Sequence, residues 1–152
     1  MDNTKFDLNK EERSRLVKGY NEKSERMPNF KRNLWGGTIG LHSTTSDMLK
    51  YIKLHLDSTN KAVKESHRKL ANTPYGFSIG YYWNLVEESE TKIYRHHGGI
   101  YGMQNWLVIY PEDNIGISIL TNSSFDDAGK ILEIAVKNLF LEIKDISFVQ
   151  SD

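Results

Sequence analysis

The sequence predicts an α+β fold in which an antiparallel sheet, a meander of about four strands, is covered by a C-terminal helix. From residue 75 onward, short runs rich in Val, Ile, Tyr and Trp alternate with turn residues, which is the usual hairpin pattern. After the last strand run, apolar residues recur at the spacing of a helix that covers a sheet. We therefore expect a single domain over residues 1–152, helical and irregular over 1–74 and composed of sheet and terminal helix over 75–152.

Short elements are expected before residue 42. The charged residues 7–15 fit a short helix that Asn9 can cap, since an Asn side chain accepts hydrogen bonds from the first turn. Residues 16–20 indicate a brief strand, and the polar, proline-containing residues 21–33 indicate a loop. Three glycines among bulky side chains over residues 34–41 suggest a backbone packed closely against another element.

Two helices are expected before the sheet. Residues 43–47 carry hydroxyl or carboxyl groups that can cap a helix over residues 46–56, whose apolar residues fall at helical spacing. Residues 61–70 show a weaker helical pattern with few apolar positions.

The strands of the meander follow. They are expected over residues 75–85, over 93–97 after a polar turn, and twice more up to residue 122, with a Pro-Glu-Asp-Asn turn between the last two. Asp126 and Asp127 favour the start of the terminal helix, because negative charge is stabilised at a helix N-terminus.

Composition excludes several classes of function. Twenty Lys and Arg balance twenty Asp and Glu, so no overall charge recruits nucleic acid or an anionic membrane. The absence of cysteine excludes disulfides, thiolate metal sites and a cysteine nucleophile. No apolar run approaches the ~20 residues of a membrane span, and the first four residues do not indicate a signal peptide.

The corner formed by His96, His97, Gly98 and Gly99 is the strongest candidate site. Consecutive side chains of a strand point to opposite faces, so His96 and His97 cannot both chelate one metal ion. The other three histidines show no ligand spacing, and we expect neither a metal nor a cofactor. Glycines at a strand end allow a ligand to approach the backbone closely.

Three short matches to hydrolase motifs are rejected as catalytic. Ser-x-x-Lys occurs at Ser58 and again at Ser66, but about one such match is expected by chance in this composition. Neither match precedes an apolar helical stripe that would bury it beside a sheet. Tyr-x-Asn occurs at Tyr82 within an aromatic run, where packing in the core is the more common role.

The corner resembles the C-terminal signature of the serine β-lactamase-like hydrolases, which include class C β-lactamases, D-Ala-D-Ala carboxypeptidases and related esterases and peptidases. In that family a strand carries Lys-Thr-Gly or His-x-Gly, followed by a glycine turn, a Pro-Glu turn and a Leu-Thr-Asn strand end. Upstream, the family has an Arg-Leu-Ala-x-Gly-Tyr phrase and a Gly-Gly-Leu-x-Ser-Thr-Ala-x-Asp-Leu phrase. The matching residues are His96-His97-Gly98, Gly102, Pro111-Glu112, Leu120-Thr121-Asn122, Arg15-Leu16-Val17-Lys18-Gly19-Tyr20 and Gly40-Leu41-His42-Ser43-Thr44-Thr45-Ser46-Asp47-Met48.

The resemblance covers nearly the whole chain but only part of the family's domain. The nucleophilic Ser-x-x-Lys and the Tyr-x-Asn of the family both precede these phrases, so the resemblance implies a partial domain, the C-terminal part of a β-lactamase/transpeptidase-like fold. It also implies hydrolysis of an amide, a β-lactam or an ester through an acyl-enzyme, with no activity in this chain alone. The alternative is a non-catalytic remnant or binding module of the same fold.

The resemblance implies a role for each residue of the corner. His96 takes the cleft position that holds a substrate carboxylate or carbonyl, and it can change charge near neutral pH, unlike a lysine. His97 takes the intervening position, where a packing role is favoured. Gly98 allows close approach, the backbone N–H of Gly99 is a candidate oxyanion-hole donor, and Tyr101 is placed at the cleft mouth.

The resemblance also implies partners. The substrate is a small molecule or a peptidoglycan-type compound, bound once the missing half is supplied. In the family, N-terminal strands lie beside the strand that matches residues 115–121, so an uncovered edge here predicts a homodimer, strand exchange or a complementing chain. The family is commonly periplasmic or extracellular, and the sequence does not fix the localisation.

Overall fold

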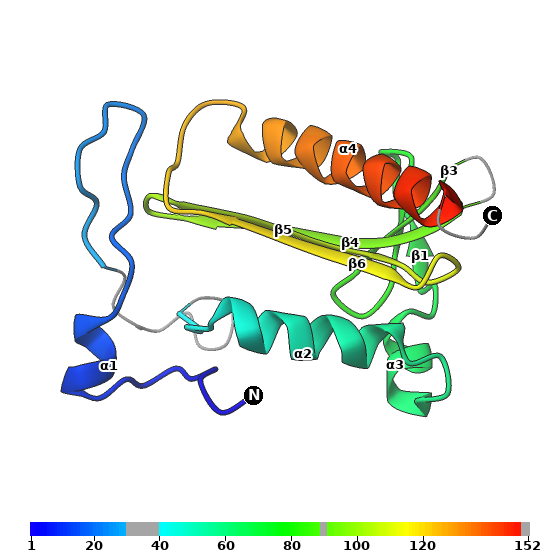
Figure 1. The fold of residues 1–152 in the computed structure, drawn as a ribbon, viewed down its shortest axis with the longest axis horizontal. Helices are drawn as coiled ribbons and strands as arrows, with labels where there is room; N and C mark the ends of the chain where they lie inside the picture. Colours follow the sequence, from blue (N-terminus) through cyan, green and yellow to red (C-terminus); the bar gives the residue numbers. More distant parts are fainter. Residues whose placement is uncertain (30–39, 89–90, 150–152) are drawn as a thin grey trace.

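A six-stranded antiparallel sheet lies between helices in the computed structural model of the chain, which describes residues 1–29, 40–88 and 91–149 (Figure 1). Helix α4 covers one face of the sheet, and α2 and α3 lie on the other. The strands follow one another in chain order, β1-β2-β3-β4-β5-β6, so the sheet is a meander. The elements are α1 (Lys10–Ser14), α2 (Thr45–Leu56), α3 (Lys61–Ser66), β1 (Ala71–Asn72), β2 (Ser78–Ile79), β3 (Asn84–Glu88), β4 (Thr91–Ile100), β5 (Met103–Tyr110), β6 (Ile115–Thr121) and α4 (Ala128–Val149).

The alternation of side chains along β5 separates two apolar cores. Trp106, Val108 and Tyr110 face α4, whereas Leu107 and Ile109 face α2. This is the period-two pattern of a strand buried on both sides. The sheet is therefore a true middle layer, which requires cover on each face.

The two edges of the long strands are open in different ways. Strand β3 pairs only with the first half of β4, from Glu88 opposite Thr91 to Asn84 opposite Arg95. Residues 96–100 of β4 thus pair with β5 alone. At the other side of the sheet, β6 pairs with β5 along its whole length and is the last strand.

Helix α2 begins at a well-defined cap and packs closely on the sheet. Thr44 is the N-cap, and its side chain accepts a hydrogen bond from the backbone N–H of Asp47. At the far end, Ile52 and His55 are buried against the sheet. A side chain at Gly116 of β6 would collide with Ile52, so this glycine is what lets the helix approach.

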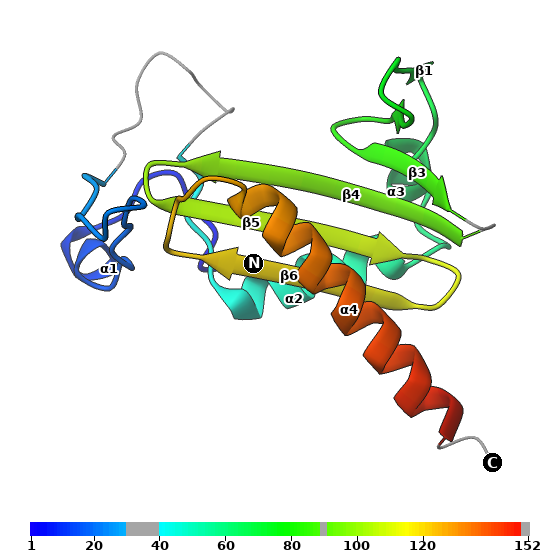
Figure 2. The same cartoon turned by 90° about the horizontal axis from the view of Figure 1, so that it is seen from above.

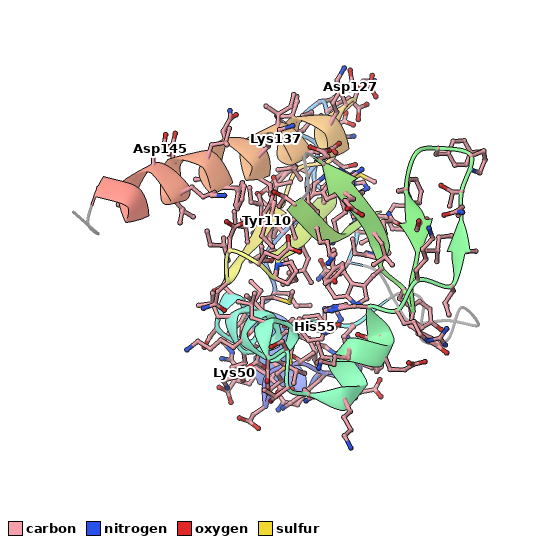
Figure 3. All side chains as sticks on the ribbon, turned by 90° about the vertical axis from the view of Figure 1, so that its right-hand side faces the viewer. Lys50, His55, Tyr110, Asp127, Lys137 and Asp145 are labelled. Carbon is pink, nitrogen blue, oxygen red and sulfur yellow. The ribbon has the colours of Figure 1, made fainter. Side chains whose placement is uncertain are left out.

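Helix α4 crosses the opposite face diagonally. It is anchored by Leu132, Val136 and Phe140, and the Phe140 ring stacks on Tyr110 with ring centroids 3.7 Å apart. Tyr110 lies on the sheet below α4 in Figure 3. The C-terminal part of the helix extends past β6 and beyond the sheet (Figure 2).

The expected α+β architecture and covering helix are confirmed, with differences in detail. The expected strand over residues 16–20 is wrong, because only Tyr20 forms bridges, to Arg26 and to Ser123. The expected strand over 75–85 is split into β2 and the start of β3 by a turn at Gly80–Trp83, where Tyr82 has φ +63°. The sheet therefore has six strands, two of them very short. The expected packing of residues 34–39 lies outside the described residues.

The helix expected over residues 61–70 ends earlier than its pattern suggests. It stops at Ser66, and the next residue, His67, turns inward and faces His55 of α2. The short helix α1 is confirmed within its expected range, with Asn9 and Glu12 forming a reciprocal capping box.

Candidate functional site

Strand β4 sends its two adjacent histidines to different faces of the sheet, as its alternation predicts. His96 lies opposite Leu107, which belongs to the core beneath α2. His97 lies opposite Trp106, which belongs to the core beneath α4. The two imidazoles therefore have separate surroundings, and any chemistry of one does not involve a side-chain contact with the other.

His97 is a packing residue at the start of α4. Its Nε2 lies 2.9 Å from Oε1 of Gln104, and its ring centroid lies 5.2 Å from that of Trp106. The ring also reaches Gly129, where an added Cβ would lie 3.0 Å from the imidazole. The Trp106 indole N–H donates to the Gly129 carbonyl, so these side chains fasten the first turn of α4 to the sheet.

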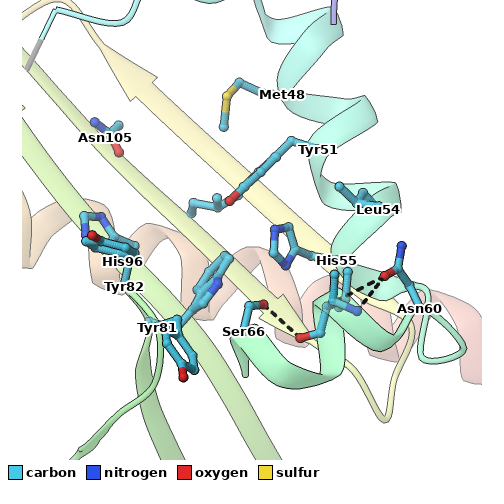
Figure 4. Close-up of a pocket in the computed structure, with 14 residues that line it drawn as sticks. Met48, Tyr51, Leu54, His55, Asn60, Ser66, Tyr81, Tyr82, His96 and Asn105 are labelled. Atoms are coloured by element: carbon cyan, nitrogen blue, oxygen red, sulfur yellow. Dashed lines mark hydrogen bonds between the residues drawn. The ribbon is translucent and has the colours of Figure 1, made fainter. Parts of the chain in front are cut away.

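His96 lines a cavity of about 580 Å³ on the other face. Figure 4 shows the cavity between α2, α3 and the strands, with His96 and Asn105 on the sheet side and Met48, Tyr51 and His55 on the helix side. None of the described residues that line it carries a carboxylate, ammonium or guanidinium group. The lining residues are Met48, Tyr51, Leu54, His55, Asn60, Ala62, Val63, Ser66, Tyr81, Tyr82, Trp83, His96, Asn105 and Leu107.

The electrostatics of His96 follow from this position. Loss of contact with water lowers the pKa of His96, and the neighbouring His97 lowers it further. Its imidazole is consequently neutral at pH 7, where it can donate or accept a hydrogen bond but supplies no fixed charge.

The two glycines after the histidines leave room for side chains of β5. A Cβ at Gly98 would lie 3.0 Å from Nδ2 of Asn105, and this amide donates to the Gly98 carbonyl. A Cβ at Gly99 would lie 2.5 Å from Oε1 of Gln104. The free edge of β4 begins at His96, so both glycines lie on backbone that β3 does not cover.

Tyr101 lies farther from the cavity than the sequence suggests. It belongs to the turn between β4 and β5, is 56% exposed, and is not among the residues that line the cavity. Its carbonyl lies close to Gly19, so this turn contacts the N-terminal segment. Of the five residues in the predicted site, only His96 borders the cavity.

Two positions from the rejected motifs also line the cavity. The Ser66 hydroxyl donates to the Val63 carbonyl, and Lys69 is not among the lining residues. Tyr82 is 89% exposed at its turn, and Asn84 lies outside the cavity wall. Neither motif brings its second residue to the cavity, so their placement does not recreate the family's catalytic arrangement.

A second pair of histidines, which the sequence pattern does not indicate, lies beside the cavity. His55 Nδ1 lies 3.0 Å from His67 Nε2, and the edge of Trp83 contacts both rings. His67 also stacks on Tyr94 of β4, with centroids 4.1 Å apart. This aromatic group ties α2 and α3 to the sheet.

Burial acts on both rings of this pair. It lowers the pKa of His55, and together with the nearby His55 it lowers the pKa of His67 to about 4. Both rings are therefore neutral at pH 7. One donates and the other accepts the hydrogen bond between them.

The described residues also limit metal binding and membrane crossing. No group of three His, Cys, Asp or Glu side chains is arranged to hold a metal ion within them. No described helix combines the length and apolar character needed to cross a membrane.

Comparisons with known proteins agree with this architecture. The Beta-lactamase family model matches residues 1–139. A solved penicillin-binding protein homologue from Pyrococcus abyssi, described as octameric, superposes with a TM-score of 0.63 at 22% identity. The alignment covers 82% of this chain and 31% of that one, so the chain spans less than a third of the solved homologue. Among curated proteins, none matches the chain.

An antiparallel sheet between helices, with a His-x-Gly strand end beside a cavity, defines a fold of the β-lactamase and penicillin-binding protein class. The match of the family model over most of its length shows that the chain belongs to the Beta-lactamase family.

Proposed function

We propose that the chain supplies one wall of a serine hydrolase site, and that the nucleophile and its base come from residues outside this sequence. The observation that supports this most directly is the position of His96. It lies where the free edge of β4 begins and lines a cavity whose described residues include no charged side chain. A cavity without charged side chains suits a largely apolar ligand, which can be a protein segment that carries the nucleophile or a substrate that carries the reacting carbonyl.

In the proposed site, His96 is the donor of the His-x-Gly wall and the backbone N–H of Gly99 is one oxyanion-hole donor. The Ser-x-x-Lys and Tyr-x-Asn motifs, which come from the same gene or from another chain, lie opposite His96 and Gly99 across the site. The reaction is acyl transfer: the serine oxygen attacks the carbonyl of an amide, β-lactam or small ester, the C–N or C–O bond breaks, and the nitrogen or oxygen of the leaving group takes up a proton. Water then hydrolyses the acyl-enzyme, which releases the acid and restores the serine. Gly98 permits the substrate backbone to approach, and residues 1–152 form a partial domain.

The first experiment uses the chain alone. We expect no serine-dependent turnover of a chromogenic cephalosporin or a p-nitrophenyl ester, and no covalent mass shift after incubation with either. An acyl adduct located by mass spectrometry on Ser58 or Ser66 would contradict the proposal, because these serines belong to the motifs that we reject.

The second experiment supplies the missing wall. An N-terminal segment of a Beta-lactamase family member, carrying Ser-x-x-Lys and Tyr-x-Asn, is co-expressed with or fused to the chain. We expect a covalent adduct on the supplied serine, with a rate that His96→Ala lowers by on the order of 10²-fold or more and that His97→Ala leaves within a few-fold. A folded complex in which His96→Ala has no effect would favour the alternative, a non-catalytic remnant or binding module.

A further inference from the structure

Helix α3 buries little of its own surface. Val63 is the one buried residue among its six, and it lines the cavity. At the end of the helix, the Ser66 carbonyl accepts a hydrogen bond from the Tyr81 N–H at 3.0 Å, and the next residue, His67, enters the aromatic group beside the cavity. A segment with so few buried side chains opens locally at a smaller free-energy cost than the core of a sheet.

Helix α2 packs on the sheet without help from α3. Ile52 belongs to the same core as Leu107 of β5, and it fills the space that a side chain at Gly116 would occupy. Loss of the contact between His55 and His67 therefore leaves α2 in place. The element that such a loss releases is α3.

The hydrogen bond between His55 and His67 tolerates one added proton but not two. The two facing nitrogens lie 3.0 Å apart, and in the neutral pair one ring donates while the other accepts. A single protonated ring still donates to the lone pair of its neighbour. When both rings are protonated, both facing nitrogens carry a hydrogen and neither accepts, and two positive charges repel at this distance.

The rings that surround the pair do not supply a negative charge near neutral pH. Trp83 contacts both imidazoles with its edge. The titratable neighbours are Tyr51, which contacts His55, and Tyr94, which stacks on His67. Burial raises the pKa of both tyrosines, so they stay neutral while histidine titrates.

Two carboxylates lie between His55 and His67 in the sequence, and each has another partner. Asp57 accepts hydrogen bonds from Thr59, which lower its pKa. Glu65 pairs with Arg68, which lowers the pKa of Glu65. Both carboxylates therefore stay ionised throughout the titration range of histidine and do not themselves change charge there.

We propose that the His55–His67 pair is an acid-sensitive switch that holds α3 against α2 and β4. Uptake of one proton by each ring releases residues 57–68, while the sheet, α2 and α4 stay folded. Asn60, Val63 and Ser66 line the cavity from α3 and its cap, so their release opens the cavity on that side (Figure 4). This inference does not depend on the proposed hydrolase role.

Proton uptake and release of α3 form one equilibrium. Burial lowers the pKa of both rings in the closed chain, so protons bind more tightly once the rings reach water. Because two protons enter together, the equilibrium constant for opening rises by up to ~100-fold per pH unit, against at most ~10-fold for a single histidine.

The first test is hydrogen exchange of the chain at about pH 6 and about pH 5, corrected for the intrinsic effect of pH on amide exchange. The amides of Lys64 and His67 donate to the Asn60 and Val63 carbonyls, so they report on α3. We expect their protection to fall by more than ~10-fold over this unit, while the amides of β5 and α4 keep theirs. A parallel loss of protection in β5 would mean that the whole chain unfolds, and would overturn the proposal.

Two variants leave a single titrating ring in the pair. His67→Phe keeps a ring against Tyr94, and His67→Gln keeps a group that can hydrogen-bond to His55. In each variant the protection of the Lys64 amide should fall by no more than ~10-fold over the same pH unit. The matched control His97→Gln, on the other face of the sheet, should keep the steeper fall. A fall as steep as that of the parent chain in both His67 variants would refute the switch, and circular dichroism establishes that each variant is folded.

The second test follows the imidazole protons by NMR as the pH is lowered. His55 and His67 should titrate with a common midpoint and a Hill coefficient above about 1, because the two protons enter together. His97 should titrate separately with a coefficient of about 1. Separate midpoints for His55 and His67, with α3 still protected from exchange, would show that the rings take up protons in place and would exclude the release of α3.

Discussion

His96 and His97 are adjacent in β4, but their side chains lie on opposite faces of the sheet and have different neighbours. Their substitutions should therefore have different effects on stability. His97 contacts Gln104, Trp106 and the first turn of α4, whereas His96 borders a cavity. Replacing His97 removes a hydrogen bond and a ring contact, whereas the described residues give the His96 side chain neither of these.

The stability of the isolated chain should therefore distinguish the two histidines. We expect His97→Ala to lower the free energy of unfolding by about 1 kcal/mol, through loss of the Gln104 hydrogen bond and the Trp106 contact. His96→Ala should change it by less than about 0.5 kcal/mol. Urea denaturation monitored by circular dichroism measures both values, and the reverse order would show that His96, not His97, fastens the sheet.

The His55–His67 pair predicts a dependence of stability on pH. Both pKa values are lower in the folded chain than in the unfolded one, so the unfolded chain binds more protons. The stabilisation is complete above the ordinary histidine pKa and is lost as the pH falls toward about 4. The other titratable groups that face the pair are Tyr51 and Tyr94, which are neutral throughout this range.

This dependence can be measured with urea midpoints between pH 7 and pH 4. His67→Phe keeps an aromatic ring against Tyr94 and removes the titrating group, so the fall in midpoint should be clearly smaller. His55, His42 and His96, whose pKa values burial also lowers, contribute to the remainder, as does Asp47, whose pKa is lowered as well. The control His97→Gln alters an exposed histidine on the other face and should retain the full fall. An unchanged fall in His67→Phe would refute the assignment.

At the scale of elements, one buried carboxylate holds the start of α2. Asp47 is fully buried and accepts hydrogen bonds from the backbone N–H of Asn3 and the Thr4 hydroxyl, both at 2.9 Å. The Lys50 ammonium lies 3.1 Å away. Burial alone would raise the pKa of Asp47, but Lys50, Thr4 and Asn3 outweigh burial and lower it. The N-terminal residues are thus attached to α2 through this group.

Asp47→Ala should lower the urea midpoint more than Asp47→Asn, because the amide keeps an acceptor for Asn3 and Thr4 whereas alanine leaves both donors without one. Hydrogen exchange should locate the loss at residues 1–5 and the first turn of α2. Uniform exchange across the sheet would mean that Asp47 supports the whole fold instead of this attachment.

Helix α4 depends on its core stripe. Phe140→Ala removes the ring stacked on Tyr110 and should cost about 3–5 kcal/mol. Leu141→Ala, next to it but 50% exposed, should cost less than about 0.5 kcal/mol. Thermal and urea unfolding of the two variants compare them directly, and similar losses would show that Leu141 is covered in solution.

Local patterns predicted the elements that depend on few long-range contacts. A cap for α2 among residues 43–47, the α4 stripe and the separation of His96 from His97 all follow from local sequence and spacing, whereas the structure identifies Thr44 as the cap. The turn at Tyr82 was missed, because a left-handed backbone at a tyrosine leaves no composition signal. The His55–His67 pair was missed for another reason: its rings meet only when α3 folds back onto α2.

At the scale of the whole molecule, residues 1–29 contact one end of the sheet, at the turn between β4 and β5 and at the residues that follow β6. The Tyr20 N–H donates to the Asn122 carbonyl at 2.9 Å, and the Ser124 N–H donates to the Tyr20 carbonyl at 2.8 Å. Gly102, in the turn between β4 and β5, has φ +71°, and a Cβ there would collide with Gly19 and the Tyr20 nitrogen. The contact therefore requires a glycine both for its backbone conformation and for space.

Gly102→Ala should separate these two requirements when it is compared with Gly76→Ala. Gly76 also has positive φ, +81°, but an added Cβ there meets nothing within 4 Å, so its substitution costs only the conformational strain of about 1–2 kcal/mol. Gly102→Ala should cost clearly more, because the N-terminal segment must move away from the turn. Limited proteolysis should then cleave residues 1–29 first while the sheet persists. Equal losses in the two variants would show that residues 1–29 are held chiefly elsewhere, by the contacts of Asn3 and Thr4 with Asp47 of α2.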